Sequence, residues 1–256
     1  MSQYQQELEF AKGLAKEAGD IAMRYFRTNQ LGVEWKEDNT PVTKADKKIN
    51  KLVIDSVKSQ FPNDGVLGEE ESYKTDGSRL WVVDPIDGTQ PFSIGVPTFT
   101  FSLGLVEKDP ILGVIHDPVA DKTYWCDSGV AYCNDARIRV NDADTINNSY
   151  IVVSSRMGDG RRHTGEVYDA VIDTGGKVFS FRSIIYGLML VATGQVVAAM
   201  AGYCGPWDIA AAIPILEAAG AKITDLDGNT LKYDEVKNGI LVSNGKVHDQ
   251  MLEIIK

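Results

Sequence analysis

The chain contains 256 residues, in which 36 Asp and Glu outnumber 26 Lys and Arg and give a formal net charge of −10. The composition, 43% hydrophobic and 24% charged, is typical of a globular protein and excludes disordered, collagenous and coiled-coil chains. A chain of this length can bury a large core, in one large domain or two small ones. The acidic excess argues against a nucleic-acid partner bound through a general basic surface, so a metal site or a small-molecule pocket is favoured.

Cysteine usage and the first residues predict a cytoplasmic protein. Cys126, Cys133 and Cys204 are too few and too irregularly spaced for a disulfide framework or a thiolate zinc site. The chain begins MSQYQQEL, without the basic and apolar regions of a signal peptide. Residues 184–207 carry no charge over the length of a membrane span, but several glycines and Pro206 interrupt them. We therefore expect a buried core segment and no membrane partner.

Two helices are predicted at the front of the chain. Apolar residues from Leu8 to Tyr25 recur at steps of three and four, which is the pattern of an amphipathic helix. Thr43 is the expected N-cap of a second helix, which ends near Phe61 and Pro62.

Short β-rich runs follow between Val66 and Val140, separated by Gly, Pro and Asp. Because most of the connections are short, much of this sheet is expected to be antiparallel. The predicted strands are VLG, LWVV, FTFSLGLV, ILGVI, KTYWC and RIRV.

Strands and helices alternate after residue 142, which predicts a second, α/β half of the chain. We expect two halves, 1–142 and 143–256, with most of the candidate metal ligands in the first. The elements expected in the second half are strands at 150–153, 177–181 and 196–200, helices at 165–172 and 183–192, and a helix that begins at Trp207.

Residues 221–231, AKITDLDGNTL, are similar to the nucleophile motif of haloacid-dehalogenase-like phosphatases. Only 25 residues follow this segment, which is too few for the rest of such a domain, and Asn229 breaks the spacing of the motif. We interpret the segment as an Asp-Gly hairpin turn between two strands.

The most informative window is 80–92, LWVVDPIDGTQPF. An apolar strand leads directly into Asp84, Pro85 fixes φ, and the Asp87-Gly88 pair turns the chain, so two carboxylates are held at the end of a strand. A solvated turn uses the same residue types, and this pair alone does not decide between a turn and a functional site.

Further acids favour a functional site. Glu69, Glu70 and Glu71 follow another predicted strand, and Asp208 stands at the start of a helix. Clustered carboxylates repel one another unless cations lie between them. Oxygen-only ligands of this kind suit Mg²⁺, so the combination predicts a magnesium site.

Four motifs occur in the order PVTKAD at 41–46, GEE at 68–70, DPIDGT at 84–89 and WDIAAA at 207–212. Together they resemble the successive signatures of the inositol monophosphatase family, within the wider fructose-bisphosphatase-like fold. The resemblance implies an α/β protein with a layered αβαβα sandwich. It also implies a Mg²⁺-dependent phosphoric monoester hydrolase that forms a homodimer and is inhibited by lithium.

The resemblance implies a specific set of metal ligands. Glu69, Asp84 and the backbone carbonyl of Ile86 would hold one Mg²⁺, and Asp84, Asp87 and Asp208 would hold a second. A third, weaker ion would lie near Glu69, so two to three ions are expected, and Mn²⁺ could replace Mg²⁺. Bridging metals lower the pKa of a bound water towards ~7 and neutralise charge on phosphoryl oxygens.

The same resemblance implies which residues orient the attacking water and which bind the phosphate. Asp46, which would reach the third ion through water, and Thr89 would orient the attacking water. The backbone N–H groups of Gly88 and Thr89 would bind the phosphate, at the start of a short helix whose dipole favours an anion. The expected substrate contacts are Ile86, Asp87, Gly88, Thr89, Arg182 and Asp208.

Two positions depart from the family pattern. Pro91 replaces an asparagine, and a proline in the first turn of a helix contributes no N–H, so the phosphate donors must come from earlier residues. Ala201 stands seven residues before Asp208, where inositol monophosphatases carry a glutamate that contacts substrate hydroxyls. Inositol phosphate therefore cannot be assumed as the substrate.

Several functions stay open at this point. An inositol-1-phosphate-type phosphatase competes with a histidinol-phosphate phosphatase, whose members also lack that asparagine and carry Tyr-Gly as at 186–187. Nucleotide 3′-phosphatase and sugar bisphosphatase activities are further alternatives. A metal-dependent regulatory binding protein without turnover is the non-enzymatic one, although it would have no chemical reason to retain Asp46 and Thr89.

The remaining basic residues have less certain roles. Arg182, or a cation in the loop at 154–163, could bind a second phosphate or a carboxylate, and a solvated loop is the alternative. The loop cations are Arg156, Arg161, Arg162 and His163. The histidines, interpreted as structural or surface residues, are His116, His163 and His248.

Overall fold

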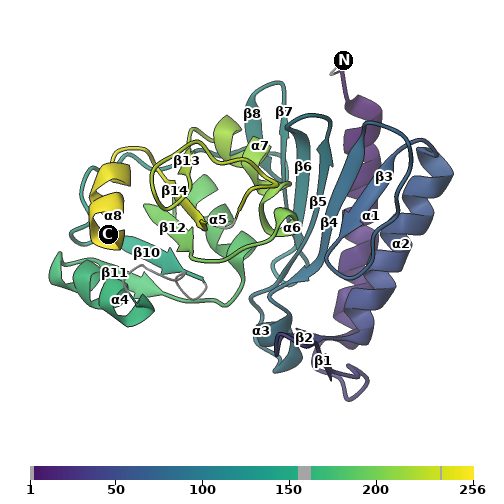
Figure 1. Ribbon diagram of the computed structural model, residues 1–256, viewed down its shortest axis with the longest axis horizontal. Coiled ribbons are helices and arrows are strands. Elements are labelled where there is room, and N and C mark those ends of the chain that lie inside the picture. The colour runs from purple at the N-terminus through teal and green to yellow at the C-terminus, as the bar shows by residue number, and fades with distance from the viewer. Residues whose placement is uncertain (1–2, 155–162, 237) are drawn as a thin grey trace.

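The structure is a computed structural model that describes residues 3–154, 163–236 and 238–256 (Figure 1). Its elements stack in five layers, in the order helices, sheet, helices, sheet, helices. The two outer layers are α1 with α2 and α4 with α8, while α5, α6 and α7 lie between the two large sheets. This architecture confirms the predicted layered αβαβα sandwich.

The two front helices are confirmed as α1 (Gln5–Tyr25) and α2 (Lys44–Gln60). The Thr43 side chain caps α2 by accepting a hydrogen bond from the Ala45 N–H at 3.2 Å. Asp46 completes the capping box, because its carboxylate accepts from the Thr43 N–H at 2.9 Å. A two-stranded hairpin, β1 (Glu34–Trp35) and β2 (Pro41–Val42), precedes α2.

The first large sheet has seven strands in the order β3-β4-β5-β6-β7-β8-β9. Only β3 and β4 are parallel, which confirms a largely antiparallel sheet. The strand predicted at RIRV is wrong beyond Arg137, and the strand at Val130–Cys133 was not predicted. The strands are β3 (Gly65–Gly68), β4 (Leu80–Asp87), β5 (Thr100–Val106), β6 (Pro110–Asp117), β7 (Lys122–Asp127), β8 (Val130–Cys133) and β9 (Ala136–Arg137).

The second sheet has five strands in the order β11-β10-β12-β14-β13. Strand β10 is parallel to β11 and to β12, while β14 is antiparallel to β12 and β13. The strand expected at 177–181 ends earlier, at Phe179. The strands are β10 (Tyr150–Val153), β11 (Lys177–Phe179), β12 (Ala198–Ala201), β13 (Lys222–Thr224) and β14 (Ile240–Ser243).

The interpretation of residues 221–231 as a hairpin between two strands is confirmed for the turn and wrong for the second strand, because no strand directly follows the turn. The turn exists, since the Asp225 carboxylate accepts hydrogen bonds from the N–H groups of Asp227 at 2.9 Å and Asn229 at 2.8 Å. However, β13 pairs with β14, which begins only at Ile240. The side chain of Asp225 closes the turn locally, and the chain returns to the sheet after a longer loop.

The uncharged stretch at 184–207, predicted to be a buried core segment, contains α5, β12 and the start of α6. Across the described ranges, no helix has both the length and the apolar character needed to cross a membrane. The helices beyond α2 are α3 (Thr89–Ser93), α4 (Thr164–Asp173), α5 (Ile184–Ala192), α6 (Pro206–Ile209), α7 (Ala212–Ala218) and α8 (His248–Ile255).

Two facing glycines let the α6–α7 segment lie directly on the first sheet. Gly104 of β5 and Gly113 of β6 are paired across the ladder. A Cβ atom on Gly113 would lie only 1.9 Å from the Ala211 carbonyl oxygen, and one on Gly104 would lie 2.9 Å from the Ala211 nitrogen. The absence of side chains on these two glycines therefore sets how closely this segment, which includes Asp208, approaches β5 and β6.

The expected halves, 1–142 and 143–256, each contain one large sheet. Helix α7 of the second half packs against β6, β7 and β8 of the first, as well as against β13 of its own sheet. The division into two halves stays a prediction.

Candidate active site

A β-bulge in β4 brings the first two acids together. Asp84 pairs with Ser102 and Asp87 with Thr100, so three residue steps on β4 oppose two on β5. Side chains alternate along a regular strand, and a separation of three would place Asp84 and Asp87 on opposite faces. The extra residue in the Pro85-Ile86 segment restores them to one face, and Pro85 suits a bulge because it donates no ladder hydrogen bond.

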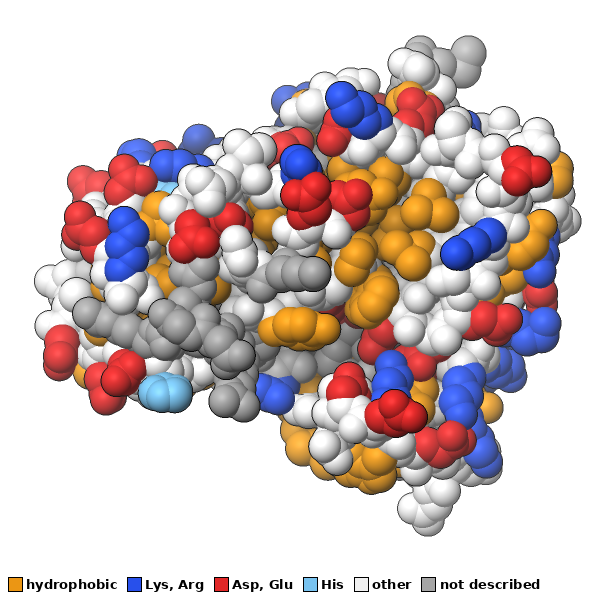
Figure 2. Space-filling view, viewed as in Figure 1, with side chains coloured by type: hydrophobic (Ala, Val, Ile, Leu, Met, Phe, Trp, Pro, Cys, Tyr) orange, Lys and Arg blue, Asp and Glu red, His pale blue; other side chains and the backbone are white. Residues whose placement is uncertain are grey.

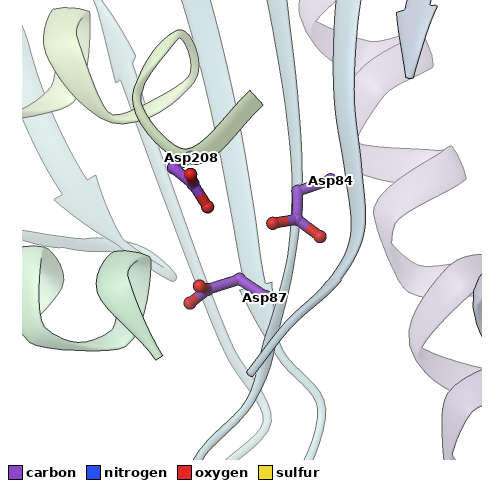
Figure 3. Close-up of side chains that lie close together, drawn as sticks. All are labelled: Asp84, Asp87 and Asp208. Atoms are coloured by element: carbon purple, nitrogen blue, oxygen red, sulfur yellow. The ribbon is translucent and has the colours of Figure 1, made fainter. Parts of the chain in front are cut away.

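Asp208 reaches the same place from α6. One carboxylate oxygen each from Asp84, Asp87 and Asp208 lies within 4.8 Å of the others. Figure 3 shows the three carboxylates arranged around a common space. The Asp208 carboxylate also accepts a hydrogen bond from the Gly205 N–H, which fixes it at the first turn of α6. The structure thus joins three of the predicted ligands, from segments more than a hundred residues apart.

The electrostatics of this group fit a bound cation. Burial, followed by the nearby charges of Glu69, Asp87 and Asp208, raises the pKa of Asp84 well above its ordinary range. Burial and Asp87 do the same to the pKa of Asp208. Among the described residues, the buried Oδ1 of Asp84 has no hydrogen-bond partner. An orphaned carboxylate oxygen beside two other acids matches the oxygen-only donor set that Mg²⁺ or Mn²⁺ prefers.

Glu69 lies close enough to raise the pKa of Asp84, as the prediction of a shared ion requires, but it has a partner that the sequence did not suggest. The Lys36 ammonium contacts Glu69 Oε1 at 2.9 Å and Glu70 Oε1 at 2.6 Å. Figure 2 shows acidic and basic side chains side by side in this lower part of the molecule, near β1 and β2. Lys36 follows β1 in a polar turn, and its sequence context carries no signal for this role.

The structure brings Asp46 and Thr89 into contact. Thr89 Oγ1 lies 3.2 Å from Asp46 Oδ1 and 3.0 Å from the Ile86 carbonyl oxygen. Burial raises the pKa of Asp46 to about 7, against the opposing effect of its hydrogen bonds with Thr43. Gly88 is the N-cap of α3 and has a φ of 91°, a left-handed conformation that favours glycine. The predicted short helix after Asp87 is therefore confirmed.

The other predicted residues lie around this centre or outside it. Arg182 directs its Nε to Gln90 Oε1 at 3.0 Å. Ala201 is fully buried in an apolar cluster, so the position implied for a substrate-contacting acid faces the core. Arg156, Arg161 and Arg162 lie outside the described residues.

The histidines make local contacts that fit structural or surface roles. His116 Nδ1 lies 3.0 Å from Thr123 Oγ1. His248 is buried between Thr224 and Ser243, at 2.9 and 2.8 Å. His163 is the N-cap of α4, and its backbone N–H donates to Glu166.

The raised carboxyl pKa values predict that Mg²⁺ stabilises the protein more at higher pH. Asp46, with a folded pKa of about 7, and Asp84 bind protons more tightly when folded, so their stabilising contribution is lost as pH rises through the folded pKa. A cation compensates the ionised carboxylates. The increase in melting temperature on adding Mg²⁺, measured by calorimetry, should therefore be larger at about pH 8 than at about pH 6.

The raised pKa values of Asp208 and Asp87 add to this difference in the same direction, because both carboxyls belong to the same group. The buried His116 and His248 titrate in both the presence and the absence of Mg²⁺, so their effect on stability cancels. A gain that is equal at both pH values, or larger at the lower one, would contradict the assignment of the raised carboxyls to a cation site.

Comparison with known proteins decides the family. The model of the inositol monophosphatase family matches residues 3–256. The chain belongs to this family. A histidinol-phosphatase of Chlorobaculum parvum is 34% identical over 97% of the chain and 96% of its own length. A fructose-1,6-bisphosphatase/inositol-1-monophosphatase of Thermotoga maritima is 30% identical over 84% of the chain and 82% of its own length. A solved IMPase structure from Thermotoga maritima superimposes with a TM-score of 0.88, at 28% identity over 98% of the chain and 96% of its own.

Membership of the inositol monophosphatase family establishes the reaction class. Proteins of this family are metal-dependent phosphoric monoester hydrolases acting on small phosphorylated compounds, and this chain is one of them. The Asp84, Asp87 and Asp208 group supplies a place for metal within the fold. The names of the relatives differ in substrate, so family membership alone leaves the substrate open.

Proposed function

We propose that this protein hydrolyses a small phosphate monoester of the inositol-1-phosphate type, using a water activated by Mg²⁺. The observation that carries the proposal is the convergence of Asp84, Asp87 and Asp208, with the Asp84 Oδ1 buried and without a hydrogen-bond partner among the described residues. Such a group is unstable by itself and is stabilised by a divalent cation.

The proposed ligands follow the family pattern. Glu69, Asp84 and the Ile86 carbonyl would hold one Mg²⁺, and Asp84, Asp87 and Asp208 a second, with a third near Glu69. When bound, the ions would lower the pKa of a coordinated water and neutralise charge on the phosphoryl oxygens. Mn²⁺ offers the same preference for oxygen ligands.

Asp46 and Thr89 are proposed to orient the attacking water. The Thr89 hydroxyl has two acceptors within reach for its single proton, Asp46 Oδ1 at 3.2 Å and the Ile86 carbonyl oxygen at 3.0 Å. The lone pairs of Thr89 Oγ1 can then accept a proton from the water. The N–H groups of Gly88 and Thr89, at the start of α3, would hold the phosphate, and Asp87, Asp208 and Arg182 would face the organic part of the substrate.

Histidinol phosphate is the second candidate substrate. The relative from Chlorobaculum parvum, 34% identical to this chain, is named a histidinol-phosphatase. The buried Ala201 also favours histidinol phosphate over inositol phosphate, because its position offers no carboxylate to the hydroxyls of a polyol. A nucleotide 3′-phosphate and a sugar bisphosphate are further alternatives within the family.

A substrate panel tests the proposal. Phosphate release should be measured with Mg²⁺, and with EDTA as the control, from inositol 1-phosphate, histidinol phosphate, fructose 1,6-bisphosphate and a 3′-phosphonucleotide. Release from inositol 1-phosphate that requires Mg²⁺ supports the first candidate, and preferential release from histidinol phosphate supports the second. Failure on all four with intact Mg²⁺ binding would favour a regulatory binding protein.

The proposal extends to the compartment, the oligomeric state, the inhibitor and the partners of the enzyme. We propose a cytoplasmic homodimer that is inhibited by lithium and has no nucleic-acid or membrane partner. Light scattering measures the oligomeric state, and a titration with Li⁺ at fixed Mg²⁺ measures inhibition.

Lys36→Met is expected to strengthen cation binding. The Lys36 ammonium neutralises Glu69 and Glu70, so it would compete with a cation for the same carboxylates. Its removal should lower the dissociation constant for Mg²⁺ about tenfold, which corresponds to about 1.4 kcal/mol. Isothermal titration calorimetry measures the constant.

The control for this variant is Lys232→Met, which removes an exposed lysine paired with Glu235 at 2.9 Å, and should leave Mg²⁺ binding unchanged. Unchanged or weaker binding in Lys36→Met would show that Lys36 does not compete with the metal.

A further inference from the structure

The carboxylate of Asp87 is bound by the second half of the chain. Its Oδ1 accepts from the Ile184 N–H at 2.9 Å, and its Oδ2 accepts from the N–H groups of Ile185 at 2.9 Å and Tyr186 at 3.3 Å. The Ser183 hydroxyl is a fourth donor, to Oδ2, and the Thr100 hydroxyl of β5 is a more distant fifth, at 3.4 Å from the same oxygen. A candidate metal ligand on β4 is thus held by the first turn of α5, almost a hundred residues later in the chain.

Ser183 has a defined hydrogen-bond direction at this junction. Its side chain is the N-cap of α5 and accepts from the Tyr186 N–H at 3.4 Å. An ionised carboxylate can only accept, so the single hydroxyl proton of Ser183 is donated to Asp87. Ser183 is 1% exposed, which leaves little room for water to replace its hydroxyl.

The DPIDGT motif itself makes room for this serine. A Cβ atom on Gly88 would lie 2.9 Å from the Cβ of Ser183, closer than side chains approach one another. The glycine after Asp87 therefore allows the start of α5 to reach the carboxylate, in addition to adopting the left-handed conformation of the α3 N-cap.

Helix α5 also packs against the segment that carries Asp208, the third candidate ligand. It packs against α6, which carries Asp208, and against α7, which continues from it. It also packs against β12 and β14 of its own sheet and against β4 and β5 of the first. One helix of the second half therefore holds Asp87 by hydrogen bonds and lies against the element that carries Asp208.

We propose that Ser183 is a positioning residue that orients the Asp87 carboxylate for cation binding. The inference rests on the proposed metal-dependent function. A charge-assisted hydrogen bond from a buried hydroxyl fixes the rotation of a carboxylate, and loss of such a contact behind a ligand typically weakens metal binding 10- to 100-fold. The three N–H donors and the more distant Thr100 hydroxyl, at 3.4 Å from Oδ2, remain without the Ser183 hydroxyl, so the carboxylate is retained but less well oriented.

Calorimetric titration of Mg²⁺ or Mn²⁺ tests the proposal with four proteins: wild type, Ser183→Ala, Ser183→Thr and Thr193→Ala. Ser183→Ala is expected to bind the cation about 10- to 100-fold more weakly, and Ser183→Thr, which keeps a hydroxyl, to restore most of the affinity. Thr193→Ala is the matched control, because it removes a hydroxyl that bonds to the Met189 carbonyl at 2.8 Å at the opposite end of the same helix. It should bind the cation as the wild type does, whatever its melting temperature.

Phosphate release gives a second readout. In Ser183→Ala the Mg²⁺ concentration for half-maximal release should rise by the same factor as the dissociation constant, and saturating Mg²⁺ should recover most of the rate. Wild-type affinity in Ser183→Ala, or equal weakening in Thr193→Ala, would overturn the proposal. If Ser183→Ala does not fold, wild-type affinity in Ser183→Cys, whose thiol is a weak donor, would overturn it.

The test separates this inference from the proposed function. Absence of phosphate release from the whole substrate panel, with the expected order of cation affinities, would remove the proposed reaction and leave the role of Ser183 intact. The reverse result, wild-type cation affinity in Ser183→Ala with normal turnover, would remove only the role of Ser183.

Discussion

Asp84→Asn is expected to abolish Mg²⁺-dependent phosphate release and, in the same protein, to raise the melting temperature measured in EDTA. Asp84 is fully buried beside other acids, and its Oδ1 has no hydrogen-bond partner among the described residues. The neutral amide removes like-charge repulsion and can donate to the remaining carboxylates, while the proposed shared metal ligand is weakened. We expect at least about a 1,000-fold loss of rate and a gain of about 1 to 2 kcal/mol in stability, or several degrees.

Asp87→Asn is the informative contrast to this variant. It should also lose activity, but its melting temperature in EDTA should fall, because an amide nitrogen would face one or more of the five donors that now bind the carboxylate. Asp55→Asn, on the exposed face of α2, controls for the loss of one negative charge and should behave as the wild type. A destabilised, active Asp84→Asn variant would refute the assignment of Asp84 to a cation site.

Gly113→Ala is expected to destabilise the fold and to impair the site at the same time. The added methyl group would lie 1.9 Å from the Ala211 carbonyl oxygen, which is backbone and cannot rotate away. The α6–α7 segment must therefore move off β6, and Asp208, three residues before Ala211, moves with it. We expect a loss of about 3 kcal/mol, or roughly 10 °C in melting temperature, and weaker Mg²⁺ binding in the fraction that folds.

The matched control is Gly13→Ala. A Cβ atom at Gly13, within α1, meets nothing within 4 Å, so the same substitution there should be neutral or stabilising by up to about 1 kcal/mol. Thermal unfolding and Mg²⁺ titration measure both effects. Destabilisation without any change in cation affinity would show that the position of Asp208 does not depend on the contact at Gly113.

Most secondary structure could be predicted because its signals are local. The stripe in α1, the Thr43 cap of α2 and the alternation after residue 142 each depend on neighbours in the chain. The strand at Val130–Cys133 and the partner of β13 depend on pairings set by the rest of the sheet. Asp225 shows the limit: its turn chemistry was recognisable, but which strand its loop would return to was not.

The residues of the candidate site likewise separate into those with a local sequence signal and those without one. The acids could be identified because their motifs are contiguous and resemble those of a known family. Lys36 and Ser183 could not be assigned to the site, because each is connected to it only by tertiary contacts, with Glu69 and Asp87 respectively. Ser183 was recognisable as the start of a helix, but nothing in the chain indicated that a carboxylate of β4 would bind there.

The β-bulge in β4 shows that a very short stretch of chain can supply several groups of the candidate site. An extra residue in a strand leaves its own peptide group outside the regular ladder. The Ile86 carbonyl oxygen, which faces the Thr89 hydroxyl at 3.0 Å, belongs to that segment. A single inserted residue therefore turns the second acid toward the first and also gives the Thr89 hydroxyl a backbone oxygen to bind, so two contacts of the candidate site arise from one local insertion.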